Sequence, residues 1–222
     1  MVTPISPKKV IVGALASVLA ELPVLVKALA IPGIIFLVLK FFPVTDISQA
    51  GAIVFAIVSL LLHTVFAITT HRIIMLGPES MPEWGLRSWS KRETRFLGYL
   101  LVFILMISVL VAFSIVSQPI GPMIAMVVAI IGGCTLTLVF PAVAIEEEFT
   151  LGDAWRMANG HIGSLIVCIG LFTFLLGILT ILVSSIPYAL PLAAILELGT
   201  NVLTIAVLSV AFGEIRRAQA ER

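Results

Sequence analysis

Ionisable and polar side chains inside long apolar stretches are the first candidates for chemistry in this sequence. His63 lies in one such stretch and Glu197 lies in another. Thr200 and Asn201 follow Glu197 at a spacing of about one helical turn. Such groups cost free energy in hydrocarbon, so they usually either carry a function or bond to a neighbouring helix. We therefore take His63, Glu197 and Asn201 as a candidate intramembrane site for an ion, a proton or a polar solute.

Each of these residues also has a structural explanation. Glu197 can be protonated or bonded to a neighbouring helix, and His63 can be a neutral imidazole hydrogen-bonded across helices. Because a helix rises about 1.5 Å per residue, the depths of the two side chains in a bilayer are expected to differ by about 10 Å. A direct pair is therefore not expected, and a relay would need a third group.

A second set of candidates lies where apolar stretches end. The segment 82–95 mixes tryptophan with arginine and lysine, and the segment 150–161 also contains a tryptophan. Aromatic and basic side chains together are typical of segments at the level of lipid headgroups. This predicts a headgroup-level site, which could bind anionic lipid headgroups. Its candidate residues are Arg87, Lys91, Arg92, Arg95 and Trp155.

Three consecutive glutamates, 146–148, follow the fourth apolar stretch. Carboxylate oxygens suit a hard cation, but adjacent residues point their side chains in different directions, so we predict no metal site and no other cofactor. We expect a membrane boundary at which exposed carboxylates pair with the basic residues of 82–95. Such exposed pairs contribute only about 0–1 kcal/mol each.

The composition indicates the environment of these residues. Of the 222 residues, 60% are hydrophobic and 11% are charged, with a mean hydropathy of +1.21, whereas soluble chains are about 25% charged. The chain is therefore expected to form a single integral membrane domain over 1–222. A net charge of +1 gives no bulk basicity that would suggest a nucleic-acid partner.

Six stretches are long and apolar enough to cross a bilayer, which takes about 20 helical residues. They are 24–42, 48–70, 96–116, 123–140, 162–183 and 192–213. This pattern predicts an all-α fold, a polytopic bundle of six transmembrane helices. Pro32 is expected to kink the first span, and Pro141 is expected to end the fourth.

The positions of lysine and arginine predict the orientation. With a cytoplasmic N-terminus, 12 of the 13 basic residues lie on the cytoplasmic side and only Lys40 lies outside, in line with the positive-inside rule. Residues 7–21 then form a helix in the cytoplasmic interface, not a seventh span, although their basic start also resembles a secretory signal. Both termini are predicted to be cytoplasmic.

Interfacial segments divide the chain into three possible pseudo-repeats, each a short helix followed by a helical hairpin. The segments 7–21, 82–95 and 150–161 would be the short helices. In the last of them, Thr150 and Asp153 resemble a capping box, and the Asn159–Gly160 pair is a typical helix end.

Small residues predict how the spans pack. Gly163, Gly170 and Gly177 recur every seven residues, which favours one helix face that another helix can approach closely. A pore or a substrate groove is the alternative. Cys134 and Cys168 lie in apolar runs, so we expect small packing residues and no disulfide.

The stretches "FPAVAIEEEFTLGDAWRMANGHIGSLI" and "HRIIMLG" followed by "RETRFLGYLL" resemble a family of uncharacterised six-span bacterial inner-membrane proteins. More distantly, they resemble the membrane domain associated with glycerophosphodiester phosphodiesterases. The matching positions are Pro141, Thr150, Ala154, Trp155, Asn159 and Gly160, whereas three consecutive glutamates depart from the pattern. The resemblance implies a fold and a bacterial inner-membrane location, and it implies no reaction.

The sequence favours a non-enzymatic protein. The motifs GxSxG, HExxH and the P-loop are absent from it. The first hypothesis is a role in membrane organisation or as the partner of another membrane protein, including a second copy of the chain. The alternative is a small transporter or channel for a polar or amphiphilic solute, with a water-filled cavity at Glu197 as the feature that would favour it. An intramembrane enzyme acting on lipid is the third possibility.

Overall fold

The computed structural model describes residues 4–41, 48–82, 84 and 88–221. Of the described residues, 83% are helical and none lies in a strand. The predicted all-α fold is therefore confirmed.

The elements follow one another as helices joined by short turns. They are α1 (Pro7–Ala20), α2 (Leu22–Ala28), α3 (Ala30–Lys40), α4 (Gln49–Leu76), η2 (Pro78–Ser80), α5 (Lys91–Val116), α6 (Gly121–Leu136), α7 (Val139–Ala144), α8 (Leu151–Ala158), α9 (Ile162–Leu165), η3 (Ile166–Leu171), α10 (Phe172–Ser184) and α11 (Leu190–Ala220). The segment η3 is a π-helix that continues α9 into α10.

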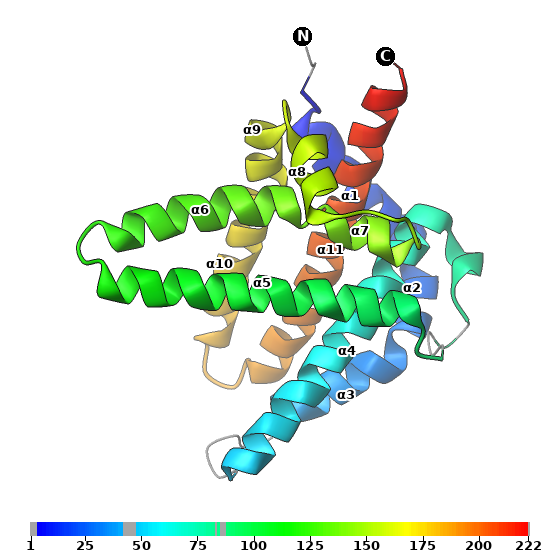
Figure 1. Ribbon diagram of the computed structural model, residues 1–222. Coiled ribbons are helices and arrows are strands. Elements are labelled where there is room, and N and C mark those ends of the chain that lie inside the picture. The colour runs from blue at the N-terminus through cyan, green and yellow to red at the C-terminus, as the bar shows by residue number, and fades with distance from the viewer. Residues whose placement is uncertain (1–3, 42–47, 83, 85–87, 222) are drawn as a thin grey trace.

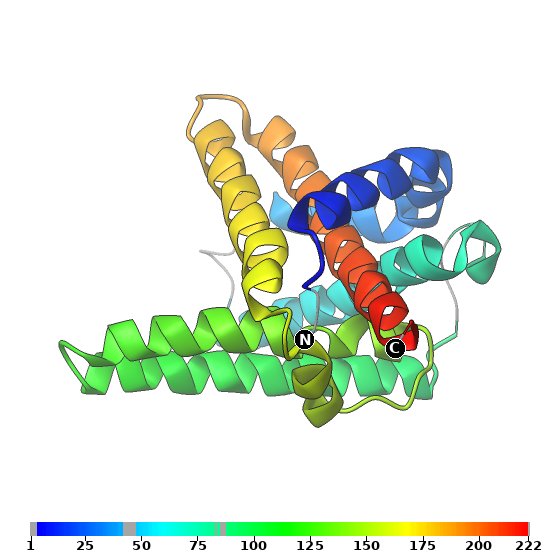
Figure 2. The ribbon, with the colours of Figure 1, turned by 90° about the horizontal axis from the view of Figure 1, so that it is seen from above.

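Three helical hairpins diverge from one end of the molecule. Helices α5 and α6 lie antiparallel and project to the left in Figure 1, whereas α3, α4, α10 and α11 extend downward. The view from above also shows the α5–α6 hairpin separated from the α10–α11 hairpin (Figure 2). The hairpins meet where α4, α7 and α11 pack together, and α1 begins and α11 ends on that same side.

Among the described residues, five helices are long and apolar enough to cross a membrane. They are Gln49–Leu76, Lys91–Val116, Gly121–Ala144, Ile162–Ser184 and Leu190–Ala220. A sixth span exists only if α1 and α2 count as one, and these two are bent by 70°. The predicted first span, 24–42, is instead divided between α2 and α3, and α3 alone has 11 residues. By the length and composition of its helices, the chain is a multi-pass membrane protein.

Prolines explain the breaks between the short helices. Pro23, Pro32 and Pro141 each lie within the first three residues of a helix, and the preceding helix ends three to five residues upstream. Proline lacks an N–H, and its ring clashes with the carbonyl four residues back, so the upstream helix cannot continue through it. The predicted kink at Pro32 is confirmed as a break. The prediction for Pro141 is wrong, because Pro141 lies inside α7 and the candidate span runs to Ala144.

The core lies at the end where the hairpins converge. Phe212 and Ile215 of α11 are fully buried there, as is Val139 of α7. Phe140 holds α5 against α7, since its ring centroid lies 4.8 Å from that of Phe96 and 5.2 Å from that of Phe103. The far ends of the hairpins have no comparable core, and no residue of α5 after Phe96 is buried. The hairpins thus share a large apolar core at one end only.

The helix predicted within 150–161 forms as α8. The side chain of Thr150 accepts from the Asp153 N–H, and the Asp153 carboxylate accepts from the Thr150 N–H, so the predicted capping box is confirmed. The helix ends at Ala158, and Gly160 has a φ of 86°. The predicted Asn159–Gly160 end is therefore confirmed too.

The other two predicted interfacial segments differ from expectation. Helix α1 packs along α11, with Gly13 beside Val210, and its outward side chains such as Val12 and Leu19 are apolar and exposed. It is therefore not amphipathic in the manner of an interfacial helix. In 82–95, Lys91 already begins α5, so the basic residues from there on belong to the span helix and not to a separate element.

The predicted glycine stripe holds at one position only. A Cβ on Gly170 would lie 3.1 Å from Cys134 Sγ, whereas Gly163 and Gly177 have open space around them. Each N–H of a π-helix bonds five residues back instead of four, so the seven-residue spacing does not return to one face across η3. Cys134 and Cys168 are free and buried, as predicted.

Candidate functional site

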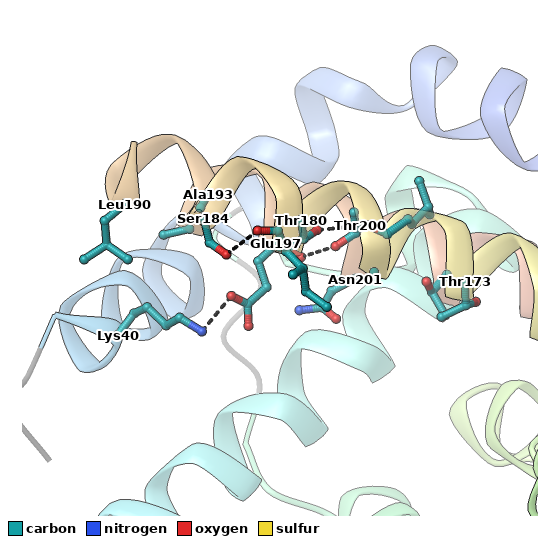
Figure 3. A pocket seen from close by; sticks show the side chains of 14 residues that line it. Lys40, Thr173, Thr180, Ser184, Leu190, Ala193, Glu197, Thr200 and Asn201 are labelled. Atoms are coloured by element: carbon teal, nitrogen blue, oxygen red, sulfur yellow. Dashed lines mark hydrogen bonds and ion pairs between the residues drawn. The ribbon is translucent and has the colours of Figure 1, made fainter. Parts of the chain in front are cut away.

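A cavity of about 440 Å³ lies between α10 and α11, toward the far end of their hairpin. We call it the seam cavity. Besides apolar side chains, it is lined by Lys40, Thr173, Thr180, Ser184, Glu197, Thr200, Asn201 and Thr204. Figure 3 shows the polar side chains of the two helices directed into the space between them. Two of the three residues predicted for the intramembrane site, Glu197 and Asn201, thus lie together in this cavity.

Helical periodicity puts these polar groups on facing surfaces. On α10, Thr173, Thr180 and Ser184 are separated by seven and four residues, which keeps them on one face of a regular helix. On α11, Glu197 and Asn201 follow the same rule. Both helices therefore turn their polar face inward and leave apolar side chains outside, where lipid would lie.

An ion pair joins α3 to α11 at the mouth of the cavity. Lys40 Nζ lies 2.7 Å from Glu197 Oε2, and the two side chains are 41% and 31% exposed. Figure 3 shows the Glu197 carboxylate between the Lys40 ammonium and the Asn201 amide. Sequence reasoning missed this pair, although Lys40 was the single basic residue expected outside and Glu197 a carboxylate in the outer half of a span.

The hydroxyl of Thr173 differs from the others in the seam cavity. Thr180 Oγ1 donates to Leu176 O at 3.0 Å, and Thr200 Oγ1 donates to Glu197 O at 2.9 Å. Thr173 Oγ1 is buried and has no hydrogen-bond partner within the described part of the chain. A buried unsatisfied hydroxyl costs about 1–3 kcal/mol, so its side of the cavity has a polar group available for a bound molecule or water.

His63 lies beside this cavity and not in it. His63 and Asn201 line a separate gap of about 10 Å³ between α3, α4 and α11, which is room for about one water at most. Asn201 therefore lines both spaces. It is the group in position to connect His63 to Glu197.

At the opposite end of the hairpins, Glu146 adopts a backbone conformation typical of glycine. Its φ is 69°. The Glu146 N–H donates to Val143 O and the Glu147 N–H donates to Ala142 O, each at 3.0 Å, which is the Schellman end of a helix. A residue with a Cβ costs about 1–2 kcal/mol in this conformation, so another interaction must favour glutamate here.

That interaction is a pair of arginines. Arg72 Nη1 and Arg92 Nη1 both donate to Glu146 Oε1, at 3.1 and 2.8 Å. The Arg92 side chain is 3% exposed and that of Arg72 is 10% exposed. Arg92 also pairs with Glu93, and Arg72 Nη1 donates to Ala144 O at 3.0 Å. We call these four residues, Arg72, Arg92, Glu93 and Glu146, the arginine hub.

The arginine hub differs in two ways from what the sequence predicted for the three glutamates. The predicted pairing with the segment 82–95 is found between Glu146 and Arg92, and the Glu146 side chain is 57% exposed. Its two arginine partners, however, are nearly buried, so removing the carboxylate should cost more than breaking a pair of exposed groups. Glu147 instead pairs with Arg216 of α11. The described residues contain no group of three His, Cys, Asp or Glu side chains that could hold a metal ion.

The predicted headgroup-level residues divide into separate places. Lys91, Arg92 and Arg95 lie together on the first turns of α5, around one cavity. Trp155 is about half exposed on α8, outside the lining of that cavity. Arg87 lies outside the described residues.

Comparison of the chain with protein-family models, with curated proteins and with solved structures finds no match. The functional argument therefore rests on the geometry of the site.

Proposed function

We propose that the protein is a non-enzymatic, multi-pass protein of the bacterial inner membrane that binds a polar or amphiphilic solute in the seam cavity, as a small transporter or channel does. The observation that carries the proposal is the open, polar-lined cavity at Glu197 among helices that are otherwise apolar. Its volume, about 440 Å³, lies in the ordinary range of about 300–1,000 Å³ for small-molecule sites.

The chemistry of the lining supports a solute with both charged and apolar parts. Lys40 and Glu197 offer a cation and an anion 2.7 Å apart, and Asn201 offers an amide beside them. A zwitterionic or dipolar group could replace the partner of each charge, while Leu176 and Ile181 contact an apolar portion. Ionisable groups in a membrane span are costly and usually functional, which favours this assignment over an incidental pair.

Binding is favoured over catalysis by the way the polar groups are already engaged. Glu197 Oε2 is paired with Lys40, and no hydroxyl among the described residues is hydrogen-bonded to the Glu197 carboxylate. The hydroxyls of Thr180 and Thr200 are bonded to carbonyls of their own helices. The resemblance to uncharacterised inner-membrane proteins is part of this proposal and is consistent with it.

The test is to purify the protein in native lipid and identify what co-purifies by mass spectrometry. Thr173→Val removes a hydroxyl that lines the cavity, and Thr69→Val is the matched control, because Thr69 also has a buried hydroxyl without a partner among the described residues. We expect Thr173→Val to reduce the retained solute about tenfold, equivalent to about 1.4 kcal/mol, and Thr69→Val to leave it unchanged. Equal retention in both variants would contradict the proposal.

The orientation is tested separately with a single-cysteine variant at Ser88. Since 12 of the 13 basic residues lie on the predicted cytoplasmic side, that cysteine should not react with a membrane-impermeant reagent added to intact cells. Labelling from outside would overturn the proposed cytoplasmic location of both termini.

A second candidate is a role in membrane organisation or as a partner of another membrane protein. It is favoured by the α5–α6 hairpin, which projects away from the other two (Figure 1) and whose α5 has no buried residue after Phe96. Cross-linking from a cysteine at Val109, an exposed position on α5, would capture a second copy or another protein if this surface is an interface. Cross-links to lipid alone would favour the solute-binding role.

A further inference from the structure

A second cavity, of about 350 Å³, lies next to the arginine hub at the start of α5. We call it the basic cavity. Its lining consists of Ser90, Lys91, Arg92, Arg95, Val143 and Glu146. Three of these residues carry a positive charge and one carries a negative charge. The basic cavity therefore has a formal charge of +2.

The three cations are not equivalent. Arg92 is 5% exposed and is held by Glu93 and Glu146, so it forms a fixed wall. Lys91 and Arg95 are exposed, and neither has an ion-pair partner among the described residues. These two provide the charge that is left for a ligand.

Glu146 does not cancel that remaining charge. Its carboxylate oxygen Oε1 already accepts from both Arg72 and Arg92. A cationic ligand would approach Lys91 and Arg95 against repulsion. An anion would instead meet two cations that break no ion pair with a described residue when they bind it.

The position of the basic cavity indicates the source of the anion. The apolar run of α5 begins at Phe96, directly after Arg95. Trp89 and Trp84 precede it and are about half exposed, and Lys27 of α2 lies 5.6 Å from the centre of the Trp84 ring. Basic and tryptophan side chains beside the start of an apolar span are typical of the headgroup level of a bilayer.

We propose that the basic cavity binds the phosphodiester of an anionic lipid headgroup, with Lys91 and Arg95 as the residues that bind it and Arg92 as the fixed support. A headgroup with a net negative charge, such as phosphatidylglycerol, fits better than a zwitterionic one, whose ammonium would face the same cations. The basic cavity and the seam cavity lie at opposite ends of the hairpins. Loss of one therefore leaves the other intact.

The experiment places the protein in nanodiscs of mixed phosphatidylcholine and phosphatidylglycerol and identifies the retained lipids by native mass spectrometry. The wild-type protein should retain phosphatidylglycerol preferentially. Lys91→Gln with Arg95→Gln should lower that preference about tenfold or more, because each basic side chain near a charged surface contributes about fivefold. Arg95→Lys alone should keep most of it, since the charge remains.

The matched control is Lys8→Gln with Arg156→Gln, which removes the same charge from two other exposed positions. An equal loss in the control would mean diffuse surface attraction, and no preference in the wild-type protein would mean no site; either result overturns the proposal. A third arm adds inorganic phosphate to the protein in detergent. If phosphate alone raises the melting temperature through Lys91 and Arg95 and phosphatidylglycerol adds nothing, the site binds free phosphate and the lipid assignment is wrong.

Discussion

The arginine hub and the seam cavity both contain ion pairs between distant parts of the chain, but their surroundings differ. In the hub, Arg72 and Arg92 are nearly buried and their donors reach Glu146, Glu93 and a backbone carbonyl. In the seam cavity, Lys40 and Glu197 are partly exposed, and a neighbouring threonine hydroxyl has no partner among the described residues.

This difference separates a structural role from a binding role. A buried charge network stabilises a fold only when its members are satisfied, and breaking it is costly. An open pair with polar groups still available can exchange its partners for those of a ligand. We therefore expect substitutions in the hub to change stability and substitutions in the seam cavity to change binding.

The largest expected effect is that of Arg92→Gln. The change leaves Glu93, which is 6% exposed, without its guanidinium, and an uncompensated buried charge costs about 3–5 kcal/mol. Thermal unfolding in detergent, followed by circular dichroism, measures the loss. The nearby exposed Arg95→Gln should change stability by less than about 0.5 kcal/mol. Similar losses in both variants would remove the distinction between hub and surface.

Three substitutions in the glutamate run test how much the charge and the backbone conformation of Glu146 contribute to stability. Glu146→Gln keeps the strained backbone and loses the charge, so it should cost about 1–3 kcal/mol. Glu146→Gly loses the charge but also relieves the φ of 69°, so it should cost about 1 kcal/mol less than Gln. Glu148→Gln is the control and should have little effect. If all three unfold alike, the boundary interpretation from the sequence holds for the whole run.

Gly170 and Gly177 lie on one continuous helix, and substituting each of them compares a tightly packed position with a position that lines the seam cavity. Gly170→Leu would drive its side chain into Cys134 Sγ, 3.1 Å from the new Cβ, and overpacking of this kind costs about 1–3 kcal/mol. Gly177 lines the seam cavity and has open space around it. Gly177→Leu should keep the stability and fill part of the cavity, so solute retention should fall. Unchanged retention with Gly177→Leu would place the solute elsewhere.

The ion pair of the seam cavity should contribute little to stability. Because Lys40 and Glu197 are 41% and 31% exposed, Glu197→Gln is expected to cost less than about 1 kcal/mol. Its effect on the co-purified solute should be much larger than its effect on unfolding. A loss of stability comparable to that of Arg92→Gln would make the pair a structural element and not a binding group.

The smallest expected effect is a dependence of the stability of α8 on pH. Hydrogen bonds from Thr150 to the Asp153 carboxylate, and then Arg156, hold the pKa of that carboxyl below its usual value of 3.8. A carboxyl whose pKa is lower in the folded protein stabilises it above the unfolded pKa, and that contribution disappears as the pH falls through the folded pKa. Hydrogen exchange of α8 should therefore increase below about pH 4. Asp153→Asn should remove this step, whereas an unchanged profile would exclude Asp153 as its cause.

Much of the fold follows from local sequence. Runs of about 20 apolar residues predict spans because the bilayer requires them, and five of the six predicted spans appear as continuous helices or as helices broken only briefly. Thr150 and Asp153 predicted the start of α8 and Asn159–Gly160 its end, because capping depends on neighbours in the chain. Where a prediction rested on uninterrupted periodicity, as for Gly163 and Gly177, the π-helix η3 shifted the register.

Only some residues of the candidate sites could be predicted from the sequence. Glu197 and Asn201 could be identified because a polar group in an apolar run is conspicuous, but Thr173 could not, since threonines are common in such runs. The basic residues of α5 could likewise be identified. Their division into the fixed Arg92 and the exposed Arg95 depends on what packs over the first turn of α5.

The sequence by itself determined that this chain spans a membrane and where its charges lie along it, since both follow from the free energy of placing each residue type in hydrocarbon or water. Only the tertiary structure decided which charges meet. Arg72 and Glu146 are 74 residues apart, and Lys40 reaches Glu197 only because α3 folds back against α11. Such contacts depend on how helices pack, and no local pattern specifies them. The same packing buries one arginine of α5 and leaves another free to bind.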